Sequence, residues 1–593
     1  MLAQRAAFLC KSHQFFATKL FLNFSCSILS NLNPSTRSFS QSLFFKSKHQ
    51  LEHVQIPNNI ILDERPISIS ERSFLTPSMK EYGNGLVLRI VRFSIVESLD
   101  EISQSSSSSW KKIFHQVLKE ALTRIQKTQP LLQSRIIRDE NTSTGFKFVM
   151  IDDEHVPEIP FYEIQFDHGK YSSLQDYLER SLLQRSYDLE KNFQLEVYYH
   201  VDSVKSELSL MFCYNHCIGD GLSLSNFIGS VLNECENIYI QNNSNQMNSR
   251  GEGVHSHPRK LLPSSDQVIL QSPFNSFTSK MKALLYGIPW IFKTITTRIN
   301  QTLVDESKRF EKRQMCTTVL ELDGTRTKAL KKFSKTHALS QNSLILSLLS
   351  HAYIRVACSH YIENHQRISQ SHQSQFNSTL RIGYPVGLSL IPDLNSVLDG
   401  SKLTVHVGTM MRDVTISPLV SCMTIPNMND DQRADTQRQE QTLQSSIIEI
   451  ARDIKDNHTK HFTNQFTLVY VMTSAANREK AILKSIETND IHFGGIPLNF
   501  ILTNNGHLES VMKRCYQFSD SLSLMMESMY AVANTSALAS ALACGVLTLP
   551  ADNAHNKEAQ LIVSISSVQP VVTREKLLAI QDELENLIGM IAQ

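Results

Sequence analysis

The spacing of hydrophobic residues changes along the chain between the two-residue period of a strand and the 3.6-residue period of a helix. Residues 86–95 are rich in β-branched side chains and alternate in their second half, which predicts a strand. Residues 110–127 place their hydrophobic positions on one face, which predicts a helix that Pro130 ends. Further strands are expected at residues 146–151, 193–201 and 208–214. The last of these is nearly all apolar at its end, which indicates a central strand.

The second half of the chain repeats this mixture. Strands are expected at residues 319–322, 383–388, 499–502 and 559–565, and helices at residues 339–356 and 573–591. Polar segments rich in Asn, Ser, Gly or His, at residues 241–266, 365–378 and 427–441, are predicted to be connectors or surface insertions. Because strands and helices mix without strict alternation, the pattern predicts an α+β fold.

The most apolar internal stretch, residues 283–292, contains Pro289 and is too short to span a bilayer. We expect a buried or interfacial helical segment there. No window of about 18 residues is apolar and uncharged, so no transmembrane helix is predicted.

Charge and cysteine content exclude several classes of function. The 593 residues carry 58 basic and 57 acidic side chains, a net charge of +1, so no overall field favours binding to nucleic acid or to an anionic membrane. The 10 cysteines include no CxxC pair, which argues against a zinc ribbon. Cys213, His216 and Cys217 are close in sequence, but we interpret the two cysteines as small buried residues rather than metal ligands. Neither a metal nor a bound cofactor is expected.

The first 50 residues form a separate compositional segment. The first acidic residue is Glu52, and the preceding residues are basic and rich in Ser and Phe, which is typical of a mitochondrial transit peptide. Residues 37–40 resemble an arginine-directed processing site. Two alternatives are a secretory signal with residues 20–29 as its apolar core, and a disordered tail of a cytoplasmic protein.

A candidate catalytic group follows the strand at residues 208–214. His216, Asp220 and Gly221 lie between that strand and a helix expected to begin near Ser223. A neutral histidine is a suitable general base near neutral pH, a carboxylate can fix its loop, and a glycine allows close approach of the backbone to a neighbour. The alternative is a structural histidine at a strand end, followed by an ordinary turn.

Residues 215–223 (NHCIGDGLS) resemble the His-His-x-x-x-Asp-Gly-x-Ser signature of the CoA-dependent acyltransferase superfamily. Four other segments resemble motifs of that superfamily in the same order, at residues 65–71, 128–133, 339–344 and 500–506. The chain departs from the pattern at Asn215, which replaces the first histidine. It also departs at Leu390, which stands where the family commonly has an arginine that pairs with the motif aspartate; Arg381 lies on the other side of that strand in sequence.

The resemblance implies two chloramphenicol-acetyltransferase-like domains, residues 51–265 and 266–593, that form a pseudo-dimer with a tunnel between them. His216 would lie in the tunnel and act as general base. An acyl group would pass directly from acyl-CoA, the co-substrate, to a small-molecule hydroxyl acceptor. Thr503 or Asn504 would donate a hydrogen bond to the oxyanion, or would alternatively cap the strand end.

Two other functions remain open. The protein could be a free-standing condensation enzyme with a carrier-bound donor and an amine acceptor, or a non-catalytic binding protein of the same fold. A monomer is compatible with the sequence, which does not specify the oligomeric state.

Overall fold

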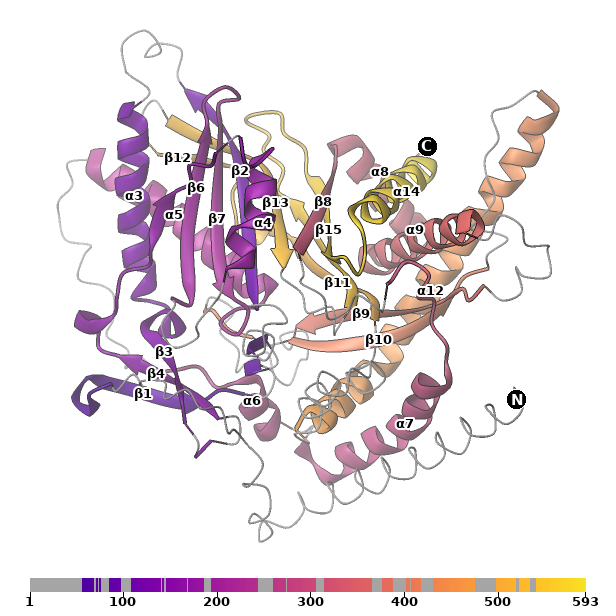
Figure 1. The fold of residues 1–593 in the computed structure, drawn as a ribbon, viewed down its shortest axis with the longest axis horizontal. Helices are drawn as coiled ribbons and strands as arrows, with labels where there is room; N and C mark the ends of the chain where they lie inside the picture. Colours follow the sequence, from indigo (N-terminus) through magenta and orange to yellow (C-terminus); the bar gives the residue numbers. More distant parts are fainter. Residues whose placement is uncertain are drawn as a thin grey trace.

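The computed structural model describes residues 56–592 except for 69–70, 73, 76–84, 98–107, 140, 143–144, 168, 186–192, 244–259, 273–274, 306–313, 365–375, 388–401, 406, 418–429, 475–497, 519–521 and 534–539. Its strands form one three-stranded sheet and two six-stranded sheets (Figure 1). The predicted leader, residues 1–50, lies outside the described residues.

The first six-stranded sheet contains the strand that ends directly before His216. Its order is β12 (Cys515–Gln517), β13 (Leu522–Ala533), β2 (Leu86–Glu97), β7 (Glu207–Asn215), β6 (Leu195–Asp202) and β5 (Phe161–Glu163). Helices α3 (Ser108–Gln126) and α5 (Gly221–Asn243) pack against each other beside this sheet (Figure 1). Because β7 lies between β2 and β6, the prediction of a central strand is confirmed.

The second six-stranded sheet has the order β10 (Val407–Thr415), β9 (Thr379–Gly387), β11 (Leu498–His507), β14 (Ser540–Leu549), β15 (Gln560–Gln569) and β8 (Gln314–Leu322). Helices α8 (Gly324–Thr336), α9 (Gln341–Asn364), α12 (Asp430–Ser474) and α14 (Arg574–Ala592) accompany it. Their apolar faces and the sheet enclose a second hydrophobic core.

The remaining elements are small. The three-stranded sheet has the order β1 (Ile61–Pro66), β4 (Phe146–Ile151), β3 (Ser134–Arg138). Three further helices are α4 (Leu174–Arg180), α6 (Ser265–Gln271) and α7 (Phe277–Thr296), so the helical segment expected around Pro289 is present. Short 3-10 turns are η1 (Asn58–Ile60), η2 (Pro130–Gln133), η3 (Asp153–His155), η4 (Leu182–Gln184) and η10 (Leu508–Ser510).

The α+β class and the two-sheet architecture confirm the predicted fold. One prediction is wrong: most of the polar segment 427–441 is the start of α12, which begins at Asp430. Residues 515–533 also form two strands of the first sheet, so the chain returns to the N-terminal half late in the sequence. The domain boundary between residues 265 and 266 therefore does not separate the two sheets completely.

The two halves pack through hydrophobic side chains and through the edge of the second sheet. Leu547, Leu549 and Ile562 of the second sheet belong to the core of the first. The edge strand β8 has a strand partner on one side only. On its other side the buried Glu179 of α4 accepts the N–H of Thr317 at 2.8 Å, and this carboxylate also pairs with Arg574 of α14 at 3.1 Å. A side chain thus covers the exposed backbone of an edge strand.

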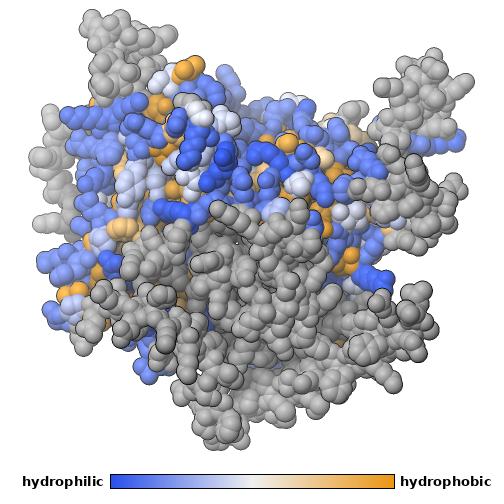
Figure 2. Space-filling view, in the orientation of Figure 1, coloured by the Kyte–Doolittle hydropathy of each residue, from blue (hydrophilic) through white to orange (hydrophobic). Residues whose placement is uncertain are grey.

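On the face seen in Figure 2 the described residues are mainly hydrophilic, with hydrophobic residues singly or in small groups between them. Among the described helices, none is both long enough and apolar enough to cross a membrane.

We predict that Glu179→Ala lowers the free energy of unfolding by about 2 kcal/mol, because the buried Thr317 N–H loses its acceptor. Glu558→Ala is the control: Glu558 pairs with Lys328 at a site where both side chains are exposed, so its loss should cost at most about 1 kcal/mol. Urea denaturation of the two variants measures the difference. Equal losses would contradict a structural role for Glu179 at the strand edge.

Candidate active site

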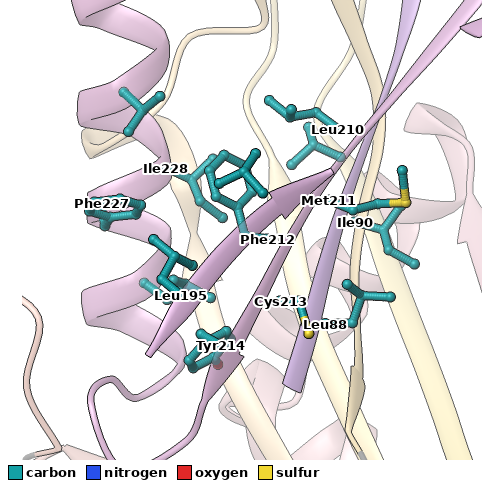
Figure 3. Close-up of a cluster of buried hydrophobic side chains, with 14 of the residues drawn as sticks. Leu88, Ile90, Leu195, Leu210, Met211, Phe212, Cys213, Tyr214, Phe227 and Ile228 are labelled. Atoms are coloured by element: carbon teal, nitrogen blue, oxygen red, sulfur yellow. The ribbon is translucent and has the colours of Figure 1, made fainter. Parts of the chain in front are cut away.

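His216 is the first residue after β7, and its backbone and ring are both held by the N-terminal half. Its N–H donates to the carbonyl of Gly85 at 2.9 Å. Its imidazole stacks on Phe74, with 4.0 Å between ring centroids and 15° between the planes. Below it, alternate side chains of β7 face opposite sides of the sheet: Phe212 packs edge-on against Phe227 of α5, whereas Cys213 lies on the other face (Figure 3). The histidine is therefore attached to a tightly packed strand.

The surroundings of the ring favour its neutral form. Nδ1 is buried and has no hydrogen-bond partner among the described residues. Burial lowers the pKa of His216 below its ordinary 6.5, and the positive charge of Arg89 acts in the same direction. Hydrogen bonding of the ring to the backbone of His216 and Gly219, together with the charge of Asp220, opposes this shift without cancelling it.

Asp220 and Ser223 form the start of α5. The Asp220 carboxylate accepts the N–H of Ser223 at 2.9 Å, and the Ser223 hydroxyl accepts the N–H of Asp220 at 3.0 Å. This reciprocal pair has the geometry of a capping box. The helix begins at Gly221 rather than near Ser223, so the residue that caps it is Asp220.

The loop is also bonded to the second half of the molecule. The carbonyl of Thr404 accepts both the N–H of Asp220, at 3.0 Å, and the hydroxyl of Ser223, at 3.0 Å. The residues just before Thr404 bond to the turn that follows α3: Lys402 donates to the carbonyl of Thr128 at 2.9 Å, and the N–H of Leu403 donates to Gln129 at 2.8 Å. Residues 402–405 thus connect two segments that carry the family resemblance.

Gly221 is needed for close packing and not for an unusual backbone angle. A Cβ at this position would lie 2.2 Å from the side-chain oxygen of Asn505, which lies where the pairing of β11 with β14 is interrupted between Asn504 and His507. The carbonyl of Gly221 accepts a hydrogen bond from the buried Arg89 at 3.2 Å. The glycine thus brings the end of β11, a strand of the second sheet, against the loop that carries His216.

The predicted oxyanion donors lie on the same strand. Thr503 and Asn504 are half-buried residues of β11 and pair with Gly545 and Val546 of β14. The side-chain oxygen of Asn504 accepts the N–H of Gly506 at 2.8 Å, so part of this amide holds the turn. Asn505 is the residue that contacts the motif loop. Donation to an oxyanion by Thr503 or Asn504 stays a prediction.

The arginine near the motif is one that the sequence patterns did not single out. Arg381 pairs through two hydrogen bonds, of 2.6 and 3.0 Å, with Asp413 on the neighbouring strand β10. Leu390 lies outside the described residues. Arg89 of β2 is buried instead beneath the motif loop. The signal that could have identified it is an arginine between the apolar residues Leu88 and Ile90 of a predicted strand, although Arg92 of the same strand gives a similar signal.

Asn215, which stands at the first histidine position of the His-His-x-x-x-Asp-Gly-x-Ser signature, has a structural function. Its side chain is fully buried, and its oxygen accepts the N–H of Cys217 at 3.0 Å. The short amide therefore fixes the turn directly after His216. This hydrogen bond gives a physical reason why asparagine is tolerated there.

A buried ion pair supports the same loop from the N-terminal side. Arg65 and Glu71 form two hydrogen bonds, of 2.9 and 2.6 Å, and Glu71 also accepts the N–H of Ser68. Burial opposes ionisation of Glu71, but Arg65 and Ser68 hold the pKa of Glu71 below its ordinary value. The charges of this pair also reach the thiol of Cys217, whose pKa burial raises well above the ordinary range. The thiol is therefore unsuited to nucleophilic attack.

Among the residues that the structure describes, none group around His216 as a metal centre would require. Across the described ranges, no group of three or more His, Cys, Asp or Glu side chains is placed to hold a metal ion. The groups that act electrostatically on the ring are backbone groups of His216 and Gly219, the Asp220 carboxylate and the Arg89 guanidinium. Backbone N–H groups and a guanidinium can stabilise a developing negative charge.

We predict that Asp220→Ala lowers the free energy of unfolding by about 1 kcal/mol, because α5 loses its cap, whereas Asp220→Asn, which retains a capping oxygen, changes it less. Asp323→Ala is the matched control. Asp323 caps α8 through the N–H of Arg326 at 2.8 Å, and its loss should cost a similar amount far from His216. Denaturant titration tests this, and equal effects of Asp220→Ala and Asp220→Asn would contradict the capping role.

Comparisons with known proteins identify the fold through structure alone. No family model matches the chain, and no curated protein matches it in sequence. The trichothecene 15-O-acetyltransferase of Fusarium sporotrichioides is similar in structure, with a TM-score of 0.60 and 11% identity over 89% of this chain and 95% of that one. The first condensation domain of the calcium-dependent antibiotic synthetase is also similar in structure, with a TM-score of 0.54 and 11% identity. The match covers 89% of this chain and 95% of that domain.

The starter condensation domain of rhizomide synthetase, solved as a mutant with C8-CoA and Leu-SNAC, gives a TM-score of 0.51 at 12% identity over 89% of this chain and 95% of that one. At such low identity these similarities establish the fold. The chain has the same fold as this acetyltransferase and these condensation domains, which is the fold that its sequence motifs predict.

Proposed function

We propose that the protein is an acyltransferase that moves an acyl group from acyl-CoA to a hydroxyl acceptor, with His216 as general base. The observation that carries the proposal is the position of His216. Its ring, whose pKa burial lowers, is stacked on Phe74 and lies where the loop after β7 meets residues 402–405 and the end of β11. The similarity to an acetyltransferase structure supports this chemistry.

The proposed reaction has no covalent enzyme intermediate. Nε2 of His216 takes the proton of the acceptor hydroxyl, because Nδ1 is enclosed. The hydroxyl oxygen attacks the thioester carbonyl carbon, the new C–O bond forms and the C–S bond breaks. The proton then passes from the imidazolium to the CoA thiolate. Binding both reactants in the predicted tunnel would contribute through proximity and orientation.

The test is release of free thiol from a panel of acyl-CoAs, with and without alcohols, by wild type and His216→Ala. We expect turnover to fall by about 10²- to 10⁴-fold, the usual contribution of a general base. His555→Ala is the control, because His555 is exposed and pairs with Asp552 on a distant turn. Equal turnover by wild type and His216→Ala would exclude the assignment.

A second candidate is amide formation from a carrier-bound acyl group. The similarity to two condensation domains supports it. Replacing acyl-CoA by pantetheine thioesters, and alcohols by amines, separates the two functions in the same assay. Turnover with amines and pantetheine thioesters but not with CoA and alcohols would favour condensation.

We predict that the acid limb of the pH profile of kcat/KM lies below pH 6.5, since burial lowers the pKa of His216 and the neutral form is the active one. Two substitutions should move this limb in opposite directions. Arg89→Met removes a positive charge that lowers the pKa of His216, so the acid limb should move to higher pH. Asp220→Asn removes a negative charge that raises this pKa, so the acid limb should move to lower pH. Shifts in the same direction in both variants would contradict the electrostatic origin.

A further inference from the structure

Helix α7 lies in a part of the chain without acidic residues. From Gln267 to Val304 the sequence contains no Asp or Glu and four basic residues, namely Lys280, Lys282, Lys293 and Arg298. The helix lies at the periphery of the molecule and packs on α12 (Figure 1). Its location and composition are not explained by the acyl-transfer site.

Over residues 277–289, where the structure describes its side chains, α7 has small residues on its buried side and large apolar residues at its surface. The buried positions Ala283 and Gly287 are small. Three large apolar residues of this part are exposed: Phe277 by 63%, Leu285 by 64% and Ile288 by 39%. Single exposed apolar residues are common, but these three share one face with the half-buried Met281 at helical spacing. A helix that only covered α12 would direct its large side chains inward.

Basic side chains flank this apolar stripe. By helical periodicity Lys280 lies along one side of the stripe, and Lys282 and Lys293 lie along the other. Among the side chains that the structure describes, no carboxylate forms an ion pair with Lys280 or Lys282. An apolar stripe bordered by lysines matches the layered chemistry of a bilayer surface, where acyl chains lie beneath anionic phosphates.

We infer that α7 is an interfacial helix through which the protein binds the surface of a bilayer that contains anionic phospholipid. Phe277, Leu285 and Ile288 insert at the boundary between headgroups and acyl chains, and the flanking lysines bind the phosphates. No residue of the stripe belongs to the catalytic loop, so binding and acyl transfer are separate properties.

The test is co-sedimentation of the full chain with vesicles of phosphatidylcholine, with or without phosphatidylglycerol. Wild type should bind the phosphatidylglycerol vesicles more tightly, and added salt should weaken this binding. Lys280→Gln with Lys282→Gln should reduce affinity for them about 25-fold, or about 5-fold for each lysine. Leu285→Ser with Ile288→Ser should weaken binding to both kinds of vesicle.

Lys331→Gln with Lys332→Gln is the matched control, since it removes the same charge from two exposed positions of α8. The control should bind as wild type does. Failure of wild type to bind anionic vesicles, or an equal loss in both lysine pairs, would overturn the proposal. So would a change of oligomeric state in Leu285→Ser with Ile288→Ser, measured by light scattering, because a second copy of the chain would then cover the stripe.

Discussion

The carbonyl of Thr404 is the point on which the geometry of the site depends. It accepts hydrogen bonds from the backbone of Asp220 and the hydroxyl of Ser223, so the cap of α5 and the contact between the two halves are one set of bonds. The loop between β7 and α5 cannot move relative to residues 402–405 without breaking both hydrogen bonds to Thr404. His216, four residues before Asp220, thus lies on a loop that bonds to both halves, although its own contacts to Gly85 and Phe74 lie within one.

Burial sets the chemistry of the histidine. A catalytic histidine is often oriented by a carboxylate on its Nδ1, which also stabilises the imidazolium. Here Nδ1 has no hydrogen-bond partner among the described residues, the ring stacks on Phe74, and Asp220 uses its carboxylate to cap a helix. Packing and the backbone bond to Gly85 orient the ring instead. The same burial lowers the pKa of His216, so orientation and protonation state have one cause.

Local periodicity was sufficient to predict the elements that carry strong patterns, among them β7, α3 and α14, and the position of His216 at a strand end. Strands β13 and β14 were missed because they contain Met, Ala, Ser and Gly in place of β-branched residues, so only pairing with their neighbours identifies them. The start of α12 was mistaken for an insertion because its first turns are uniformly polar. Arg89 and Asn505 reach the loop from distant segments, a relationship that spacing along the chain cannot contain.

A lowered pKa of His216 affects the two proton transfers of the proposed reaction in opposite ways. It makes the imidazole a weaker base toward the acceptor hydroxyl, so the first transfer depends more on alignment of the reacting atoms than on basicity. It also makes the imidazolium, with a pKa below 6.5, a stronger acid than an ordinary thiol. The pKa of such a thiol is about 8.5. Return of the proton to the leaving thiolate is therefore downhill. A desolvated histidine without a carboxylate partner suits a reaction whose leaving group is a thiolate, because the leaving group itself removes the proton and restores the neutral base.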